Sequence, residues 1–432
     1  MSGQHNNGGK ALVGELSSFS RSGIYRLPGV VNAAFVDPVR LLNFSYSRYR
    51  VSASGYYCRT FDSPGKGRKT NKEVNDSSRS KNKRKRSRSH DLNEQEIIAE
   101  RRHQEVRPLL LKAHEALSGT AELLGFLPTL VRDEESCLDG GGLEQNFVEL
   151  GGLWQAPLYE IVLCTEENTN EWQEQGLQHE ESSGSTVAPL FNNLINNNTT
   201  NDVDAEFVNR RFVLPRQCSF HMSDLRQIHD LIPGSSDQGF NLIVIDPPWE
   251  NGSAYQKAVY PTLPNRYFLY LPIRQLAHTD GALVALWMTN RGKLRSFVEN
   301  ELFPSWGVTD IRTIYWLKIK PDGSLLGDLD LIHHKPYEYL LLGYVNGKKV
   351  VPDCNQNLEE NQIFISIPGA YSRKPPLAKL LVDNIPGPKP SRCIELFARE
   401  LIAEWTSWGN EPLRFQDLTY FVKREHHDQI PC

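Results

Sequence analysis

The sequence lacks several features that would assign it to common classes of protein. Its seven cysteines are scattered over 432 residues and form no Cys-x-x-Cys pair. This argues against a disulfide framework and a structural zinc, and it favours a reducing compartment. The longest apolar run, Ala282 to Met288, is too short to cross a bilayer, and the N-terminus has no hydrophobic core of a signal peptide. We therefore expect no membrane partner. His333-His334 has no third ligand at a suitable spacing, so we also expect no metal.

The charge of the chain is unevenly distributed. The net charge is −4, yet residues 66–88 hold eleven Lys or Arg against two acids. The densest part, Lys81 to Arg88, is typical of a nuclear localisation signal or a nucleic-acid tether, and a solvated disordered tail is the plainer alternative. We expect a nuclear protein, with the cytoplasm as a second location, and a basic segment without fixed structure.

Composition divides the chain into three parts. Residues 1–90 form an N-terminal region that ends in the basic low-complexity segment, and residues 91–204 form a middle or accessory region of mixed α and β character. Within the latter, Leu92 to Leu117 is an amphipathic helix that Pro108 breaks or restarts. The polar stretch 166–204 is expected to be a loose loop.

Residues 205–432 alternate between apolar runs and helix-like segments. The expected strands are 241–245, 281–288, 311–319, 338–345, 363–367 and 392–397, and the expected helices include 293–302 and 376–384. This alternation predicts an α/β fold with a mainly parallel sheet and helices on both faces. Ligands of such sheets bind at the carboxyl ends of the strands.

One tetrapeptide stands at such a strand end. Asp246-Pro247-Pro248-Trp249 follows the first apolar run directly, and its prolines fix a rigid corner rich in hydrogen-bond acceptors. The Asp246 carboxylate and the Pro247 carbonyl can each accept one hydrogen of adenine's N6 amine, which aims the nitrogen lone pair at an electrophilic methyl group. Trp249 offers an aromatic face for a base that has left its stack. A proline turn beside a core tryptophan is the structural alternative.

The tetrapeptide and the blocks around it resemble the mRNA-type N6-adenosine methyltransferases, and most closely their methyltransferase-like-4 branch. The matching blocks are Ser223-Asp224-Leu225, Trp287-Met288-Thr289-Asn290-Arg291, Tyr315-Trp316-Leu317-Lys318, His334-Lys335-Pro336-Tyr337-Glu338, Ser372 to Ala378, Ile394 to Arg399 and Trp405 to Glu411. The resemblance implies a Rossmann-like methyltransferase fold in permuted order, with the catalytic motif before the cofactor strand. It also implies S-adenosyl-L-methionine as the cofactor.

The resemblance also assigns roles to residues. The catalytic residues are Asp246, Pro247, Pro248 and Trp249; the cofactor contacts are Asp224, Leu225, Asp246, Lys374, Glu395, Phe397, Arg399, Asn410 and Glu411; the substrate contacts are Trp249, Tyr255, Lys318, Glu338 and Ser372. Asp224 reads equally well as a helix N-cap. Lys374 precedes Pro375, a good first residue of a helix. It is expected to meet the carboxylate of the cofactor.

Two positions depart from the better-known mRNA enzymes. Those have Pro-His-Asn after the arginine, whereas this chain has Glu400-Leu401-Ile402, so the polar cofactor contacts there do not carry over. The loop after Trp249 also differs, and Tyr255, Tyr260 and Tyr267 are all candidates to cover the target base.

Three functions are open at this point. The first is an RNA adenine-N6 methyltransferase, for which the branch implies 2′-O-methyladenosine in a spliceosomal small nuclear RNA. The second is a DNA adenine-N6 methyltransferase, because RNA and DNA present the same amine. The third is a non-catalytic, nucleic-acid-binding paralogue, against which the intact Asp246 to Trp249 motif argues. A monomer is plausible, since the middle region could cover the surface that a partner occupies in relatives.

Overall fold

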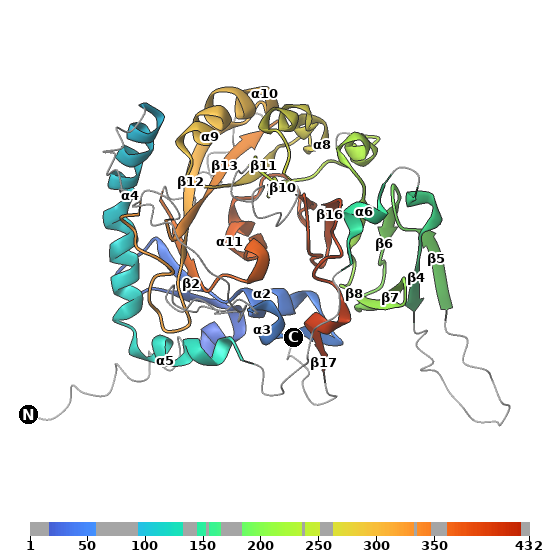
Figure 1. Cartoon of the computed structure of the whole chain (residues 1–432), viewed down its shortest axis with the longest axis horizontal. Helices are drawn as coiled ribbons and strands as arrows, with labels where there is room; N and C mark the ends of the chain where they lie inside the picture. The colour runs from blue at the N-terminus through green and yellow to red at the C-terminus, as the bar shows by residue number, and fades with distance from the viewer. Residues whose placement is uncertain are drawn as a thin grey trace, which may run out of the picture.

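A large sheet runs through the centre of the computed structural model (Figure 1). The structure describes residues 17–57, 94–132, 145–152, 155–165, 184–235, 238–250, 262–331, 335–346 and 361–424. Within them the sheet has eleven strands. In spatial order these are β1 (Ile24–Arg26), β2 (Ala33–Val36), β14 (Ile363–Ser366), β12 (Thr309–Lys318), β13 (Tyr337–Val345), β11 (Ala282–Met288), β10 (Leu242–Ile245), β15 (Cys393–Leu396), β16 (Trp405–Gly409), β9 (Ser219–Met222) and β6 (Leu194–Asn196).

The expected strands are confirmed, and so is the α/β fold class. Each of the six runs that the sequence marks as a strand lies in the central sheet, with ends within two residues of those expected. Neighbours from β11 through β10, β15 and β16 to β9 are parallel, whereas β13 runs antiparallel to both β12 and β11. The sheet is therefore mostly parallel, as expected.

Helices cover both faces of this sheet because its strands are apolar on both sides. On β10, Ile243 and Ile245 point to one face, and Leu242 and Val244 point to the other. The first face packs against α4, α5, α8, α9 and α10, and the second packs against α11 and part of α2. The helices are α2 (Pro38–Leu42), α3 (Ala53–Tyr56), α4 (Glu94–Ser118), α5 (Ala121–Leu130), α6 (Phe147–Leu150), α8 (Ile273–Leu276), α9 (Gly292–Phe297), α10 (Phe303–Trp306) and α11 (Ala378–Leu381), with short 3₁₀ or π turns η1 (Asn43–Ser45), η2 (Ala156–Leu158), η3 (Leu225–Leu231), η5 (Asn265–Tyr270), η6 (Val298–Leu302), η8 (Ala370–Ser372), η9 (Val382–Asn384) and η10 (Leu418–Tyr420).

Helix α4 corrects the expectation that Pro108 interrupts it. The helix runs without a break from Glu94 to Ser118 along one side of the molecule (Figure 1). Contacts to the body of the protein flank the proline: Arg107 pairs with Asp330 at 2.7 Å, and Leu110 is fully buried. Tertiary packing therefore outweighs the hydrogen bond that a proline removes from a helix.

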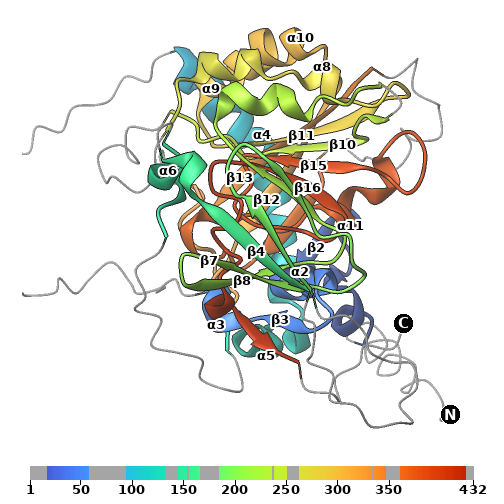
Figure 2. The same cartoon turned by 90° about the vertical axis from the view of Figure 1, so that its right-hand side faces the viewer.

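A second correction concerns the polar stretch 166–204, which is not one loop. Residues 166–183 lie outside the described part, but β5 (Gly184–Pro189), β6 and the start of β7 (Val203–Phe207) fall within it. Together with β4 (Glu160–Thr165) and β8 (Arg210–Leu214), β5 and β7 form a four-stranded sheet. This sheet lies on the right of Figure 1, the side that faces the viewer in Figure 2. The Asn197 amide donates to the Pro215 and Leu214 carbonyls at 2.8 and 3.3 Å. Polar side chains here donate hydrogen bonds to the backbone of a tight turn, so their presence does not mark a loose segment.

The N-terminal region contributes to the central sheet. Strand β2 pairs in parallel with β14, with Ala33 opposite Ile363, and β3 (Tyr49–Val51) pairs with β17 (Phe421–Lys423). Residues 24–57 are thus joined to the last part of the chain, and the expected boundary at 204/205 lies inside β7. The basic segment 66–88 lies outside the described residues.

Candidate active site

Five neighbouring parallel strands deliver the expected site residues to one edge of the sheet. Of the expected residues, Asp224 follows β9, Asn410 follows β16, Phe397 follows β15 and Asp246 follows β10, while Thr289, which was not predicted as a site residue, follows β11. The registers of these strands bring their carboxyl ends to the same level. The edge is therefore the ligand crevice that this fold class predicts.

A cavity of about 1010 Å³ opens at this edge. Most of the expected residues line it, namely Asp224, Leu225, Asp246, Pro247, Pro248, Trp249, Glu338, Ser372, Lys374, Phe397, Arg399, Asn410 and Glu411. Ligand pockets commonly measure about 300–1,000 Å³, so the cavity has room for a cofactor and part of a second molecule. Of the other expected residues, Glu395 and Lys318 lie just behind this lining, and Tyr255 lies outside the described residues.

The Asp246 to Trp249 corner is held by short backbone contacts. The Asp246 amide donates to the Leu396 carbonyl at 3.3 Å, which ties β10 to β15, and the Trp249 amide donates to the Pro247 carbonyl at 2.7 Å. A carbonyl has two lone pairs, so the Pro247 oxygen can still accept a second hydrogen bond. The Trp249 ring donates to the Trp287 carbonyl at 2.9 Å and is only 6% exposed. Trp249 is thus a fixed part of the wall and offers little open aromatic surface.

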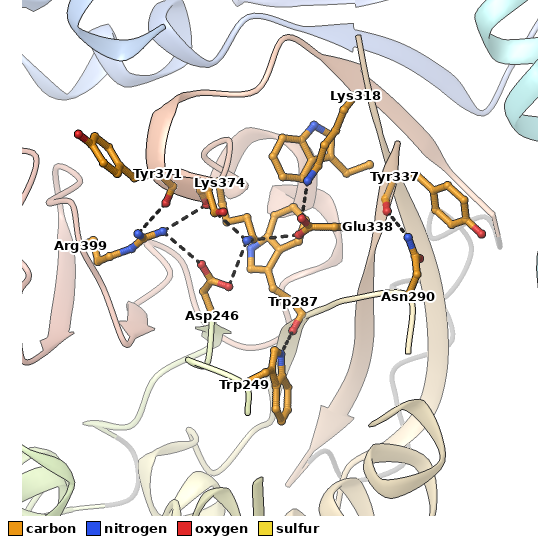
Figure 3. A network of polar contacts seen from close by, with 12 residues as sticks. Asp246, Trp249, Trp287, Asn290, Lys318, Tyr337, Glu338, Tyr371, Lys374 and Arg399 are labelled. Carbon is orange, nitrogen blue, oxygen red and sulfur yellow. Dashed lines mark hydrogen bonds and ion pairs between the residues drawn. The ribbon is translucent and has the colours of Figure 1, made fainter. Parts of the chain in front are cut away.

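Charged side chains alternate in sign across the floor of the cavity (Figure 3). Lys318 contacts Glu338, Glu338 lies 3.3 Å from the Lys374 ammonium, and that ammonium lies 3.4 Å from the Asp246 carboxylate. The Arg399 guanidinium lies 3.9 Å from the other Asp246 oxygen. The five segments that supply these residues are separate in the sequence, and the sheet brings them together.

These neighbours shift the pKa values of the buried members. Burial alone would raise the pKa of Glu338, but Lys318 and Lys374 outweigh it and lower the pKa to about 2. Burial would likewise lower the pKa of Lys374, but Asp246 and Glu338 outweigh it and raise that pKa. Both side chains therefore stay charged at neutral pH, and neither is suited to exchange a proton during catalysis.

Glu395 is in a different situation. It faces a smaller cavity behind Asp246, on the α11 side of the sheet beside Val244, and burial, followed by the charges of Asp246 and Glu400, raises its pKa to about 8. Within the described residues, no hydrogen bond or ion pair reaches its carboxyl group. A half-buried carboxyl that faces a cavity fits an acceptor for hydroxyl donors such as those of a ribose. The Glu395 carboxyl is thus compatible with a nucleoside cofactor bound at this edge of the sheet.

Arg399 and the segment after β14 support each other. The Arg399 guanidinium donates to the Tyr371 and Ser372 carbonyls at 2.8 and 3.2 Å. Both residues have left-handed backbone conformations, with φ of 53° and 60°, which are uncommon for residues other than glycine. Arg399 therefore holds a strained turn against the cavity, a role that the sequence did not indicate.

The departure at Glu400 has a structural explanation. The Glu400 carboxylate forms a two-pronged ion pair with Arg373, one prong measuring 3.0 Å. The Arg373 guanidinium is 3% exposed and lies 4.4 Å from the Tyr56 ring and 4.5 Å from the Phe415 ring. The pair links the segment that carries Lys374 to the N-terminal region. It does not reach the main cavity.

Two local expectations need adjustment. Asp224 is the N-cap of η3 and accepts from the Arg226 amide at 2.8 Å, so the alternative reading is confirmed, although Asp224 also lines the cavity. The prediction that Pro375 opens a helix is wrong, because α11 begins at Ala378. Pro375 itself precedes Pro376, and a residue before proline is pushed out of the helical region.

Several residues of the cavity lining were not identified from the sequence. The missed residues are Val148, Arg226, His229, Glu250, Leu263 and Tyr270. Val148 comes from α6 in the accessory region, and nothing in its local pattern marks it. Tyr267, one of the three candidate tyrosines, lines the cavity, whereas Tyr255 and Tyr260 lie outside the described residues.

Within the described residues, no group of three His, Cys, Asp or Glu side chains is arranged to hold a metal ion. His333 and His334 lie outside those residues. Among the helices that the structure describes, none combines the length and apolar character needed to cross a membrane.

Comparison with known proteins agrees with this geometry. Residues 240–411 match the MT-A70 family. The N(6)-adenine-specific methyltransferase METTL4 of Mus musculus is 34% identical over 341 residues, which cover 77% of this chain and 70% of that protein. The N6-methyladenosine RNA methyltransferase MTA1 of Cryphonectria parasitica is 35% identical over 193 residues, covering 43% of this chain and 55% of that protein. The DNA N6-methyl methyltransferase of Caenorhabditis elegans is 34% identical over 222 residues, covering 49% of this chain and 56% of that protein.

The match to the mouse protein extends well beyond the residues that match the family, into the accessory region. The crevice, the Asp246 corner and this long match lead to one conclusion. The chain belongs to the MT-A70 family of methyltransferases, which take their methyl group from S-adenosylmethionine, and within that family to the METTL4-like branch.

Proposed function

We propose that this protein methylates the N6 amine of adenosine in RNA, with 2′-O-methyladenosine of a spliceosomal small nuclear RNA as the expected substrate. Methyl transfer to adenine N6 is common to the names of the relatives, and the MTA1 relative is named as an RNA enzyme. The observation that carries the proposal is the rigid Asp246-Pro247 corner, which opens into a cavity large enough for cofactor and nucleoside.

The residues of the corner act on the amine by position and field. Bound S-adenosylmethionine supplies the electrophilic methyl group. The Asp246 carboxylate and the Pro247 carbonyl accept the two amine hydrogens and fix the nitrogen for in-line attack. Lys374 and Arg399 flank Asp246 at 3.4 and 3.9 Å, so its charge is compensated inside the buried site. After transfer, the nitrogen releases a proton to Asp246 or to water.

A DNA adenine-N6 methyltransferase is the second candidate. The Caenorhabditis elegans relative, which is named as a DNA enzyme, favours it. The corner contacts the base, and adenine is the same in both polymers, so these residues do not distinguish the two substrates. A non-catalytic paralogue is disfavoured, because Asp246, Lys374 and Glu395 are all present and adjacent.

We also propose nuclear localisation, supported by the basic segment Lys81 to Arg88. A fluorescent fusion of the full chain should concentrate in the nucleus, and replacing the basic residues of 81–88 with glutamine should redistribute it. Unchanged nuclear accumulation in that variant would remove the segment from the argument.

Labelled methyl transfer to matched oligonucleotides tests the substrate. Four single strands of one sequence are compared: RNA and DNA, each with and without a 2′-O-methyl group on the target adenosine. We expect the 2′-O-methylated RNA to be methylated fastest. Faster transfer to DNA would favour the second candidate. Transfer no greater than that of Asp246→Ala to all four strands would favour a non-catalytic protein.

A further inference from the structure

Two exposed tyrosines stand at the mouth of the cavity. Tyr267 and Tyr270 both line it, yet they are 49% and 74% exposed. They lie three residues apart on the 3₁₀ helix η5, and side chains with this spacing point to the same side of such a helix. Paired exposed aromatics beside a ligand cavity are a feature of binding surfaces.

Helix η5 is fixed to the catalytic corner through Phe268. This residue is fully buried, and its ring packs edge-on against Trp249 and Phe397, with centroids 5.0 and 5.5 Å apart. The Trp306 ring donates to the Phe268 carbonyl at 3.1 Å. The helix therefore presents its two tyrosines at a set position relative to the residues that hold the target amine.

Polar contacts add a cation to the same rim. The Asn265 side chain accepts from the Glu250 amide at 3.1 Å, and the Glu250 carbonyl accepts from the Arg291 guanidinium at 2.8 Å. Arg291 is exposed and lines the cavity. A guanidinium is a planar fork of five N–H donors that matches the geometry of a phosphate, and the exposed Arg291 presents such a fork at the rim of the cavity.

We propose that Tyr267 and Tyr270 form a stacking platform for the nucleotides next to the target adenosine, with Arg291 facing the backbone phosphate. The proposal rests on the proposed function and adds to it a subsite for single-stranded nucleic acid. Exposed aromatics interleaved with cations are how proteins hold single strands, because every base has a face that stacks. A protein partner fits less well, since it would close the cavity that the substrate must enter.

Equilibrium binding tests the platform. The double variant Tyr267→Ala/Tyr270→Ala should bind a single-stranded oligonucleotide at least about tenfold more weakly, because a lost base stack commonly costs about that much. The double variant Tyr267→Phe/Tyr270→Phe keeps both ring faces and should bind like the wild type. Leu158→Ala, which removes a residue that is 72% exposed and lies outside the cavity, is the control for lost apolar surface.

The ligand supplies the matching perturbation. An oligonucleotide with abasic sites on both sides of the target adenosine should bind the wild type more weakly by a similar factor. The alanine variant should bind intact and abasic strands alike, since it has no platform to lose. The platform is wrong if the alanine and phenylalanine variants lose affinity for the oligonucleotide equally. It is also wrong if the alanine variant still binds the abasic strand more weakly than the intact one.

Two further results separate this proposal from the proposed function. If the alanine variant binds S-adenosylmethionine about tenfold more weakly by calorimetry, the tyrosines cover the cofactor and the platform is wrong. If the wild type methylates RNA while the alanine variant binds that RNA as tightly as the wild type, the platform is wrong and the function stands. If the wild type methylates no nucleic acid, the proposed function fails whatever the tyrosines bind.

Discussion

Replacing Glu395 with glutamine should make the protein more stable in alkaline solution, although the residue is expected to serve the cofactor. The side chain is half-buried, and burial, followed by the charges of Asp246 and Glu400, raises the pKa of its carboxyl group from 4.5 to about 8. Keeping a negative charge there costs folding free energy, whereas glutamine keeps the shape of the neutral acid without its ionisation. The site would then hold a group that favours function at the expense of stability.

The sign and size of this stability difference follow from proton linkage. The unfolded chain loses this proton near pH 4.5 and the folded chain near pH 8, so the folded state holds more protons between these values. The free energy of unfolding contributed by Glu395 therefore falls as the pH rises through this window and is constant above it. Since one pKa unit corresponds to about 1.4 kcal/mol, the glutamine variant should gain up to about 4 kcal/mol on the wild type between about pH 5 and about pH 9.

Urea unfolding of both proteins at about pH 5, 7 and 9 measures this gain directly, because the other titrating groups cancel in the difference between them. Glu160→Gln, which removes an exposed carboxyl on β4, is the matched control and should follow the wild type at every pH. If the difference in free energy of unfolding between the wild type and Glu395→Gln is the same at all three pH values, Glu395 does not resist ionisation and the reasoning is wrong.

Three other perturbations have defined outcomes. Asp246→Ala should fold and bind S-adenosylmethionine but transfer no methyl group in a labelled-methyl assay; transfer near the wild-type rate would remove Asp246 from the mechanism. Arg373→Met should lower the free energy of unfolding by about 3–5 kcal/mol, because it leaves the Glu400 charge buried and unpaired, and adding Glu400→Leu should recover much of the loss. Pro108→Ala should raise that free energy by about 1–3 kcal/mol in urea unfolding, since α4 continues through this position and alanine restores a helical donor. No recovery in the Arg373 double variant, or a loss of stability in Pro108→Ala, would contradict the respective argument.

The central part of the fold could be predicted because its signals are local. The runs that became β10 and β11 are apolar on both faces, and such runs are typical of buried parallel strands. The Asp246 corner could be predicted for the same reason, since strand, prolines and tryptophan are adjacent in the sequence. The resemblance then supplied distant members such as Asn410, which the sheet places on the same edge.

The remaining features depend on contacts between distant segments. Strands β1 and β2 have three or four residues each, and they are stabilised as strands by pairing with each other and with β14. The run of charges from Lys318 to Arg399 depends on strand order, which no local pattern encodes. Val148 reaches the cavity from another region of the chain, and the strained turn at Tyr371 depends on a guanidinium that arrives 28 residues later.

The pairing of β2 with β14 has a consequence for how the protein is made. Strand β2 ends at Val36, and its partner begins at Ile363. At about 5–20 residues per second on the ribosome, the early strand waits on the order of tens of seconds for the partner that completes its edge. During that time a nascent chain exposes open strand edges, which are sites of aggregation. Synthesis of this enzyme should therefore depend on chaperones that hold the nascent N-terminal segment until β14 has emerged.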